Sequence, residues 1–224
     1  MKIKSILFVL LLLAFLSACK NSESTPLLLV DLTHNWTDVS NTEFNFSSVN
    51  DFSYSDKIIH AKKQSGTESG NSLRNFLLSS LGRQNVTGFE AQVKIGNNMK
   101  SCGFEFSGNP SYSSYWFMIK KDGSFVLQLQ DYSSGTKVVS NLFETTKNNT
   151  IINTSNFNTI KMEMLSNDKD TAVYINGFPV YTIKDLIFTK GTFAIYYQAE
   201  KGTYSAGKTA DAEYKILAIQ KSNQ

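Results

Sequence analysis

Short apolar stretches that alternate with polar residues, bounded by glycine, asparagine, serine or aspartate, recur from about residue 27 to residue 220 of this chain. In an extended strand successive side chains point to opposite faces, so a period of two predicts strands with one buried face. No apolar stripe with helical spacing persists, except around residues 72 to 81. We therefore expect an antiparallel protein of many short strands.

The expected strands follow each other at short intervals, which favours a two-sheet antiparallel β-sandwich or jelly roll. No repeat of about 20 to 50 residues is visible, and this argues against propellers and solenoids. The expected strands span 27–32, 43–48, 57–63, 75–80, 87–95, 101–107, 114–120, 124–131, 136–140, 157–165, 170–176, 179–183, 191–198 and 211–220.

Two glycine turns are expected to fix the register of the central strand pairs. Asp122-Gly123 separates two alternating runs, and Asn176-Gly177 does the same between residues 171–175 and 178–183. A tight type I′ connection needs positive φ at both central residues, so these dipeptides are strong hairpin signals. We interpret Asp122 as a turn residue rather than as a catalytic acid or metal ligand.

The N-terminus has the layout of an export signal. Lys2 and Lys4 precede an uncharged apolar run over residues 6–16. That run of about eleven residues is shorter than the roughly 20 that a helix needs to cross a bilayer. The segment that follows, Leu16-Ser17-Ala18-Cys19, resembles the lipobox of bacterial lipoproteins. The resemblance implies cleavage before Cys19 and lipid attached to its thiol; the alternative is a plain secretory signal with a chance cysteine.

With a lipobox at Cys19, we expect three parts in the chain. These are a signal peptide at residues 1–18, a lipidated cysteine with a polar tether at residues 19–26, and a single β-sandwich domain at residues 27–224. Acyl chains on Cys19, palmitate among them, make an anchor that does not readily dissociate. The protein is then expected in the cell envelope, on the outer membrane or the cell surface. The sequence leaves the membrane leaflet open.

Charge and cysteine content narrow the functional classes. Removing residues 1–18 takes away Lys2 and Lys4, which lowers the formal charge from +3 to about +1. The mature chain has no basic cluster larger than Lys62-Lys63, so nucleic acid is not an expected partner. With Cys19 lipidated, only Cys102 remains, and no intramolecular disulfide can form. We expect Cys102 to be buried and structural.

The order of the central motifs resembles a known family. The chain resembles the concanavalin A-like lectin and glucanase jelly rolls, in particular the laminin G-like and 3-keto-disaccharide hydrolase domains of bacterial lipoproteins, over residues 30 to 220. The resemblance implies a jelly roll and a carbohydrate ligand. The motifs that carry it are Gly88–Ile95, Gly103–Phe106, Tyr115–Ile119, Asp122–Phe125, Phe157–Met162, Val173–Gly177 and Gly191–Tyr196.

Catalytic signatures are absent from this sequence. Glucanases of the family carry a Glu-x-Asp-x-x-Glu run that places acid and nucleophile on one strand face, and no such run occurs here. Glu163 has no acidic neighbour two residues away. The histidines, His34 and His60, form no recognisable zinc spacing with Cys102. We expect no cofactor; calcium at Asn167 to Asp170 is an alternative to a solvated hairpin turn.

One face of the central strands is a candidate binding face. Along residues 115–120 the alternate residues 115, 117 and 119 are apolar, which predicts that their side of the strand faces the core. Trp116 and Met118 are then expected on the opposite face. On neighbouring strands Glu105, Tyr196 and Gln198 share that mixed-polarity side. An aromatic ring beside carboxylate and amide groups suits a sugar, whose apolar face stacks while its hydroxyls find fixed partners. The alternative is that these aromatic residues fill a second layer under loops.

Three functional hypotheses remain from the sequence. The first is a non-catalytic, surface-anchored protein that binds a polysaccharide or oligosaccharide. The second is a glycoside hydrolase of the 3-keto-disaccharide hydrolase type with an unrecognised active site. The third is a structural envelope or adhesion protein. Two carboxylates close together on the candidate face would favour the hydrolase, whereas an isolated Glu105 would favour binding.

Overall fold

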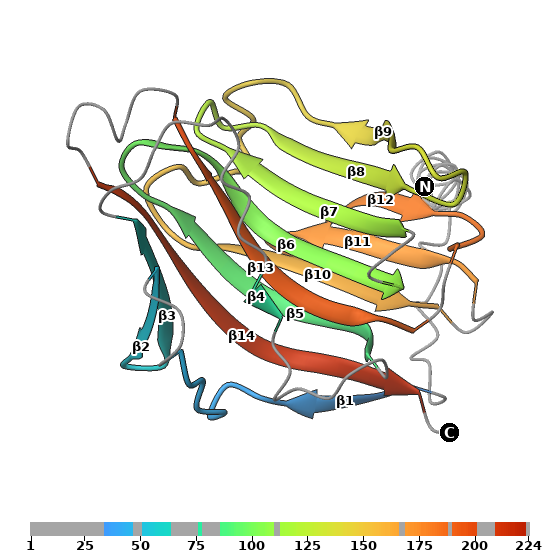
Figure 1. Ribbon diagram of the computed structural model, residues 1–224, viewed down its shortest axis with the longest axis horizontal. Helices are drawn as coiled ribbons and strands as arrows, with labels where there is room; N and C mark the ends of the chain where they lie inside the picture. The colour runs from blue at the N-terminus through green and yellow to red at the C-terminus, as the bar shows by residue number, and fades with distance from the viewer. Residues whose placement is uncertain are drawn as a thin grey trace, which may run out of the picture. The chain divides into compact units, whose positions relative to one another are not determined.

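The computed structural model describes residues 34–46, 51–63, 76–77, 86–109, 113–165, 169–187, 190–200 and 209–222. These residues form strands and no helix (Figure 1). The strands are β1 His34–Asp38, β2 Phe52–Ser55, β3 Ile58–Lys63, β4 Phe76–Leu77, β5 Val86–Ile95, β6 Met99–Asn109, β7 Ser113–Lys120, β8 Phe125–Asp131, β9 Val138–Glu144, β10 Asn158–Met164, β11 Thr171–Ile175, β12 Phe178–Ile183, β13 Thr192–Ala199 and β14 Ala210–Ser222.

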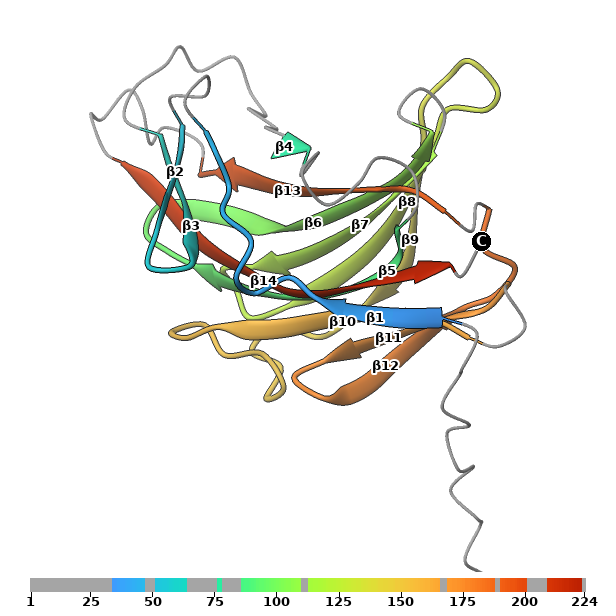
Figure 2. The ribbon, with the colours of Figure 1, turned by 90° about the horizontal axis from the view of Figure 1, so that it is seen from below.

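The strands form two antiparallel sheets. The eight-stranded sheet has the order β12-β11-β10-β5-β14-β3-β2, with β1 also paired to β14. The six-stranded sheet has the order β4-β13-β6-β7-β8-β9. In Figure 2 the two sheets lie as layers, with β13, β6 and β7 in one and β14, β5 and β10 in the other. The predicted two-sheet antiparallel β-sandwich is confirmed.

The core lies between the sheets and is rich in aromatic rings. Phe89 on β5 packs against three rings of the six-stranded sheet, at centroid distances of 5.5 Å to Phe104, 5.2 Å to Phe117 and 4.3 Å to Phe193. Each such pair contributes roughly 0.5–1.5 kcal/mol beyond the area it buries. Cys102 is fully buried in this core, as predicted, and burial raises the pKa of its thiol far above the usual range.

The predicted turns are partly confirmed. Asn176 and Gly177 both have positive φ, 50° and 82°, as a type I′ turn requires. The Asp122-Gly123 turn is not type I′, because only Gly123 has positive φ there. The amide of Lys120 donates to Ser124 O, and that of Gly123 donates to Lys120 O, so the loop has three residues and ends on a left-handed glycine. Asp122 is a turn residue, as expected.

Some predicted strands are wrong or shifted. Residues 43–46 belong to no strand, although Phe44 and Phe46 are buried and their neighbours are exposed. The segment keeps the alternation of a strand, and the rings of Phe44 and Phe46 pack on Tyr54 and Phe52. The strand expected at 136–140 is β9, at 138–144. The range 27–32 lies outside the described residues, as does 75–80 apart from β4.

Candidate functional site

The face of the six-stranded sheet that points away from the core holds the predicted ligand-binding residues. Tyr115, Phe117 and Ile119 of β7 belong to the core cluster. Trp116 and Met118, which alternate with them, therefore lie on the opposite side of the sheet. We call this side the outer face of the six-stranded sheet.

Strand register brings all five predicted residues together there. Glu105 on β6 lies opposite Trp116 on β7. Gly103 on β6 lies between Met118 of β7 and Tyr196 of β13. Gln198 lies two residues beyond Tyr196 on the same face. Residues from three adjacent strands, far apart in the sequence, thus form one patch, which we call the outer-face patch.

The two aromatic rings of the patch meet across β6. Trp116 and Tyr196 come from β7 and β13, which lie on opposite sides of β6. Their ring centroids are nevertheless 4.8 Å apart, in an edge-to-face arrangement at 62°. Gly103 of β6 is itself tightly packed against β7, since a Cβ atom there would collide with the backbone carbonyl oxygen of Phe117. The pair forms a rigid floor across the centre of the sheet.

This floor is buried in the structure. Trp116 is 3% exposed and Tyr196 is 1% exposed. The indole N–H of Trp116 donates to Ser114 Oγ at 2.6 Å. Burial raises the pKa of the Tyr196 hydroxyl well above its usual value. The two rings therefore present almost no surface to solvent, and ligand contact by the rings stays a prediction.

Partly exposed side chains of the same face surround the floor. Met118 and Gln198 are both partly exposed, and the Ser101 hydroxyl donates to Gln198 Oε1 at 3.4 Å. Gln128 lies opposite Trp116 on β8 and donates to Asn141 Oδ1 at 2.8 Å. The sequence analysis did not single out Gln128 and Asn141. For Gln128 a signal exists, because it alternates with Phe125 and Leu127 of the core.

Glu105 is the single carboxylate on this face among the described residues of β6, β7, β8 and β13. It is 8% exposed and accepts a hydrogen bond from Ser107 Oγ at 2.7 Å. Glu144 on β9 is three strands away, about 14 Å at the usual strand spacing. Its carboxylate pairs with Lys120 Nζ at 2.7 Å. Glycosidase carboxylate pairs lie roughly 5 to 9.5 Å apart, so these two do not form one.

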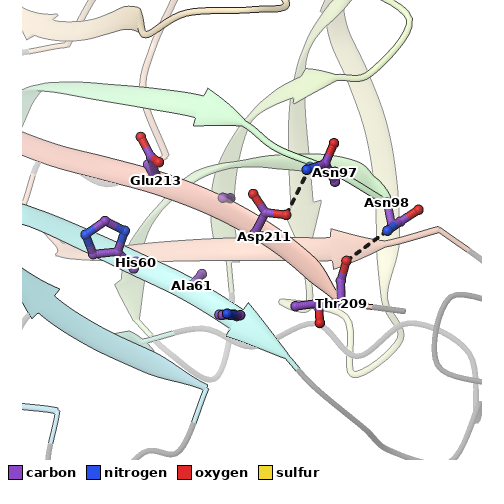
Figure 3. Close-up of a pocket in the computed structure, with 9 residues that line it drawn as sticks. His60, Ala61, Asn97, Asn98, Thr209, Asp211 and Glu213 are labelled. Atoms are coloured by element: carbon purple, nitrogen blue, oxygen red, sulfur yellow. Dashed lines mark hydrogen bonds between the residues drawn. The ribbon is translucent and has the colours of Figure 1, made fainter. Parts of the chain in front are cut away.

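A hollow of about 510 Å³ lies on the other, eight-stranded sheet (Figure 3). Asp211 and Glu213 of β14 share one face and lie opposite Lys62 and His60 of β3. Asp211 Oδ1 accepts from the Asn97 amide at 3.2 Å. Glu213 pairs with Lys94 at 3.2 Å. The hollow is polar and no Phe, Tyr or Trp ring lines it, so it lacks the large apolar ring face on which a sugar ring stacks.

The remaining candidate residues take structural roles or lie outside the described part. Glu163 pairs with Lys161 at 2.9 Å on the eight-stranded sheet. Asp170 pairs with Lys184 at 2.6 Å, while residues 167 and 168 of the calcium candidate are outside the described residues, as is Cys19. Within the described ranges no cluster of His, Cys, Asp or Glu is suited to a metal ion. In the same ranges no helix is long and apolar enough to span a membrane.

Comparisons with known proteins identify the architecture. No family model matches the chain, and no curated protein is significantly similar to it. Among solved structures, the κ-carrageenase of Pseudoalteromonas carrageenovora in complex with an oligotetrasaccharide of κ-carrageenan is similar at a TM-score of 0.54, with 9% identity, over 89% of this chain and 99% of that chain.

Two further solved structures give the same result. The laminarinase catalytic domain of Thermotoga maritima is similar at a TM-score of 0.52, with 10% identity, over 88% of this chain and 94% of that chain. A β-1,3-1,4-glucanase from a mouse hindgut metagenome has a TM-score of 0.51 and 12% identity, over 84% of this chain and 98% of that chain. The chain has the concanavalin A-like jelly-roll fold of these proteins. At such low identity the likeness shows the fold alone.

Proposed function

We propose that this protein binds a polysaccharide or oligosaccharide on the outer-face patch of the six-stranded sheet. The observation that carries the proposal is the meeting of Glu105, Trp116 and Tyr196 on three adjacent strands, with Met118 and Gln198 beside them. The proteins similar in fold act on polysaccharides by name, and one of them is in complex with a carrageenan oligosaccharide. That likeness supports a carbohydrate ligand.

The chemistry of the patch suits a sugar. Gln198 and Gln128 offer amide donors and acceptors for hydroxyl groups, and the Met118 thioether offers apolar contact. The buried pair of Trp116 and Tyr196 holds these strands at a fixed spacing. In this geometry the rings act as positioning residues and the partly exposed side chains touch the ligand. Fixed polar groups on a rigid sheet reduce the entropy cost of binding.

Binding is favoured over hydrolysis as the role of this face. A glycoside hydrolase needs a second carboxylate within about 10 Å of the first, on either side of the scissile bond. Glu105 already accepts a hydrogen bond from Ser107 at 2.7 Å, and Glu144 is far across the sheet and paired with Lys120. We therefore propose recognition without cleavage. Release of reducing sugar from a bound polysaccharide would argue instead for a hydrolase.

Membrane attachment through Cys19 is a separate part of the proposal. The lipobox-like segment before Cys19 supports it, together with the short apolar run that precedes it. Cells fed an alkyne palmitate analogue should incorporate the label into the wild-type chain and not into Cys19→Ala. Equal labelling of both chains would contradict the lipid anchor and leave the carbohydrate proposal untouched.

Calorimetry of the purified protein against a panel of polysaccharides tests the binding proposal. Gln198→Ala and Gln128→Ala should each weaken binding about tenfold, since each removes a hydrogen-bonding amide worth roughly 1.4 kcal/mol. Gln92→Ala is the matched control, because Gln92 is a partly buried glutamine on the other sheet that donates to Thr159. Equal losses for all three variants, or no binding by the wild type, would overturn the proposal.

A further inference from the structure

Strand β9 is a free edge of the six-stranded sheet. It pairs with β8 on one side and ends the strand order on the other, among the described strands. The backbone N–H and C=O groups on its free side therefore have no sheet partner. Such an edge is a template for pairing with another strand.

Most of the usual protection of an edge strand is absent from β9, apart from one register shift against β8 between Leu127 and Gln128. Val138 is 51% exposed and Val139 is 48% exposed, and these are two of four large apolar side chains so exposed in the described part of the chain. No proline and no charged residue occurs from Val138 to Phe143. Edge strands usually carry charges, prolines or bulges that prevent pairing. β12, the corresponding edge of the other sheet, has a comparable register shift against β11, and it carries in addition Pro179, which cannot donate a backbone hydrogen bond.

The charges that flank β9 make it complementary to itself. Lys137 precedes the uncharged run and Glu144 ends it. When two copies of such a strand pair antiparallel, the lysine end of each lies next to the glutamate end of the other. Opposite charges then meet at both ends, whereas parallel pairing would place like charges side by side. A second copy of the same chain is thus a better partner than an arbitrary strand.

We propose that two copies of this protein associate through antiparallel pairing of β9 with β9 about a two-fold axis. The two six-stranded sheets then continue into each other across the axis. Val139 and Asn141, which pair with Gln130 and Gln128 of β8, lie on the outer face next to the axis. The outer faces of the copies form one surface, so a long chain ligand can contact both copies. The dimer itself does not depend on the carbohydrate proposal.

Sedimentation velocity of the full chain over a range of concentrations tests the pairing. The wild type should show a concentration-dependent dimer. Val139→Lys should raise the dissociation constant at least about tenfold, because a lysine at an edge strand opposes pairing. Phe178→Lys is the matched control, since Phe178 is 59% exposed on the β12 edge, and it should leave the dissociation constant unchanged. Thermal unfolding must show that both variants remain folded.

A charge exchange tests the antiparallel orientation. Lys137→Glu should weaken the dimer several-fold, because two glutamates then meet at each end of the pair. Adding Glu144→Lys to that variant should tighten the dimer again, because each end again joins opposite charges, although this change also removes the ion pair of Glu144 with Lys120. A monomeric wild type, a Val139→Lys variant that dimerises as well as the wild type, or a double variant no tighter than Lys137→Glu would each overturn the proposal.

Discussion

The side chain of Gln220 links β14 to β10 across β5 in the eight-stranded sheet. It lies on β14 opposite Gly88 of β5, and it is 1% exposed. Its amide crosses over Gly88 to β10, where Oε1 accepts from the Met164 amide at 2.8 Å and Nε2 donates to the Met164 carbonyl at 3.2 Å. A side chain at position 88 would occupy this path, since a Cβ atom there would lie 2.5 Å from Gln220 Oε1.

We expect Gln220→Ala to lower the free energy of unfolding by about 1–3 kcal/mol, because the buried N–H and C=O of Met164 lose their partner. Gly88→Ala should also destabilise the protein, by displacing the same amide. Gln92→Ala is the control, and because Gln92 makes one hydrogen bond of 3.2 Å at a part-buried site, its cost should be smaller. Urea unfolding measures all three. Equal losses for Gln220→Ala and Gln92→Ala would contradict this account.

The hydrogen bonds of Asp122 predict how the stability of the protein depends on pH. The hydroxyl and the amide of Ser124 both donate to Asp122 Oδ1, at 2.6 and 3.1 Å, and the hydroxyl is the main cause that lowers the pKa of this carboxyl. A carboxyl with a lower pKa in the folded state stabilises the fold above its unfolded pKa. That contribution disappears as the pH falls through the folded pKa.

The wild type should therefore lose stability as the pH falls below about 4. Asp122→Asn keeps the shape of the turn but cannot titrate, so its stability should fall less steeply over the same range. Ser124→Ala removes the hydroxyl donor and leaves the amide donor, so it should also make stability fall less steeply with pH. Denaturant unfolding at a series of pH values measures both slopes. A wild-type slope in Asp122→Asn would show that this carboxyl does not contribute.

Among the elements, one hairpin turn can be predicted from its residue types and another cannot. The turn at Asn176-Gly177 can be predicted from the sequence, because asparagine and glycine are the residue types that tolerate positive φ. The β2–β3 hairpin turns at Asp56 and Lys57, with φ of 51° and 62°, and no glycine marks it. Its position depends on the pairing of β2 with β3, which lies beyond local composition. The same limit explains the wrong prediction at residues 43–46, where the alternation of a strand is present but the residues form no strand.

Lys57 should be under strain, because a side chain in the left-handed region costs roughly 1 kcal/mol. We expect Lys57→Gly to raise the free energy of unfolding by about 0.5–1 kcal/mol, even though it removes the bond from Lys57 Nζ to Asn41 Oδ1. Lys121→Gly is the control, since Lys121 has no positive φ and glycine there should be neutral or destabilising. Thermal unfolding compares the two, and a loss of stability in Lys57→Gly would refute the strain.

At the scale of the molecule, alternation and turn signals predicted the sandwich and the side of β7 that faces the core. They also placed Glu105, Trp116 and Tyr196 on one face, because side-chain parity follows from strand geometry alone. The burial of Trp116 and Tyr196 agrees with the alternative that the sequence left open, in which these aromatic residues form a second layer; side-chain alternation could not decide it, because burial depends on contacts beyond a single strand. The contact between the two rings was not predictable either, because it requires knowledge that β13 and β7 both lie beside β6.

Side-chain amide resonances test most directly whether the outer-face patch binds carbohydrate. In an NMR titration with oligosaccharides of β-glucan and carrageenan, the account predicts that the Gln198 and Gln128 amide signals shift with saturation. The Gln92 signal, on the other sheet, should remain in place. Shifts at the Asn97 and Asn98 amides around the polar hollow with none at Gln198, or no shift at any position with every oligosaccharide, would contradict the account.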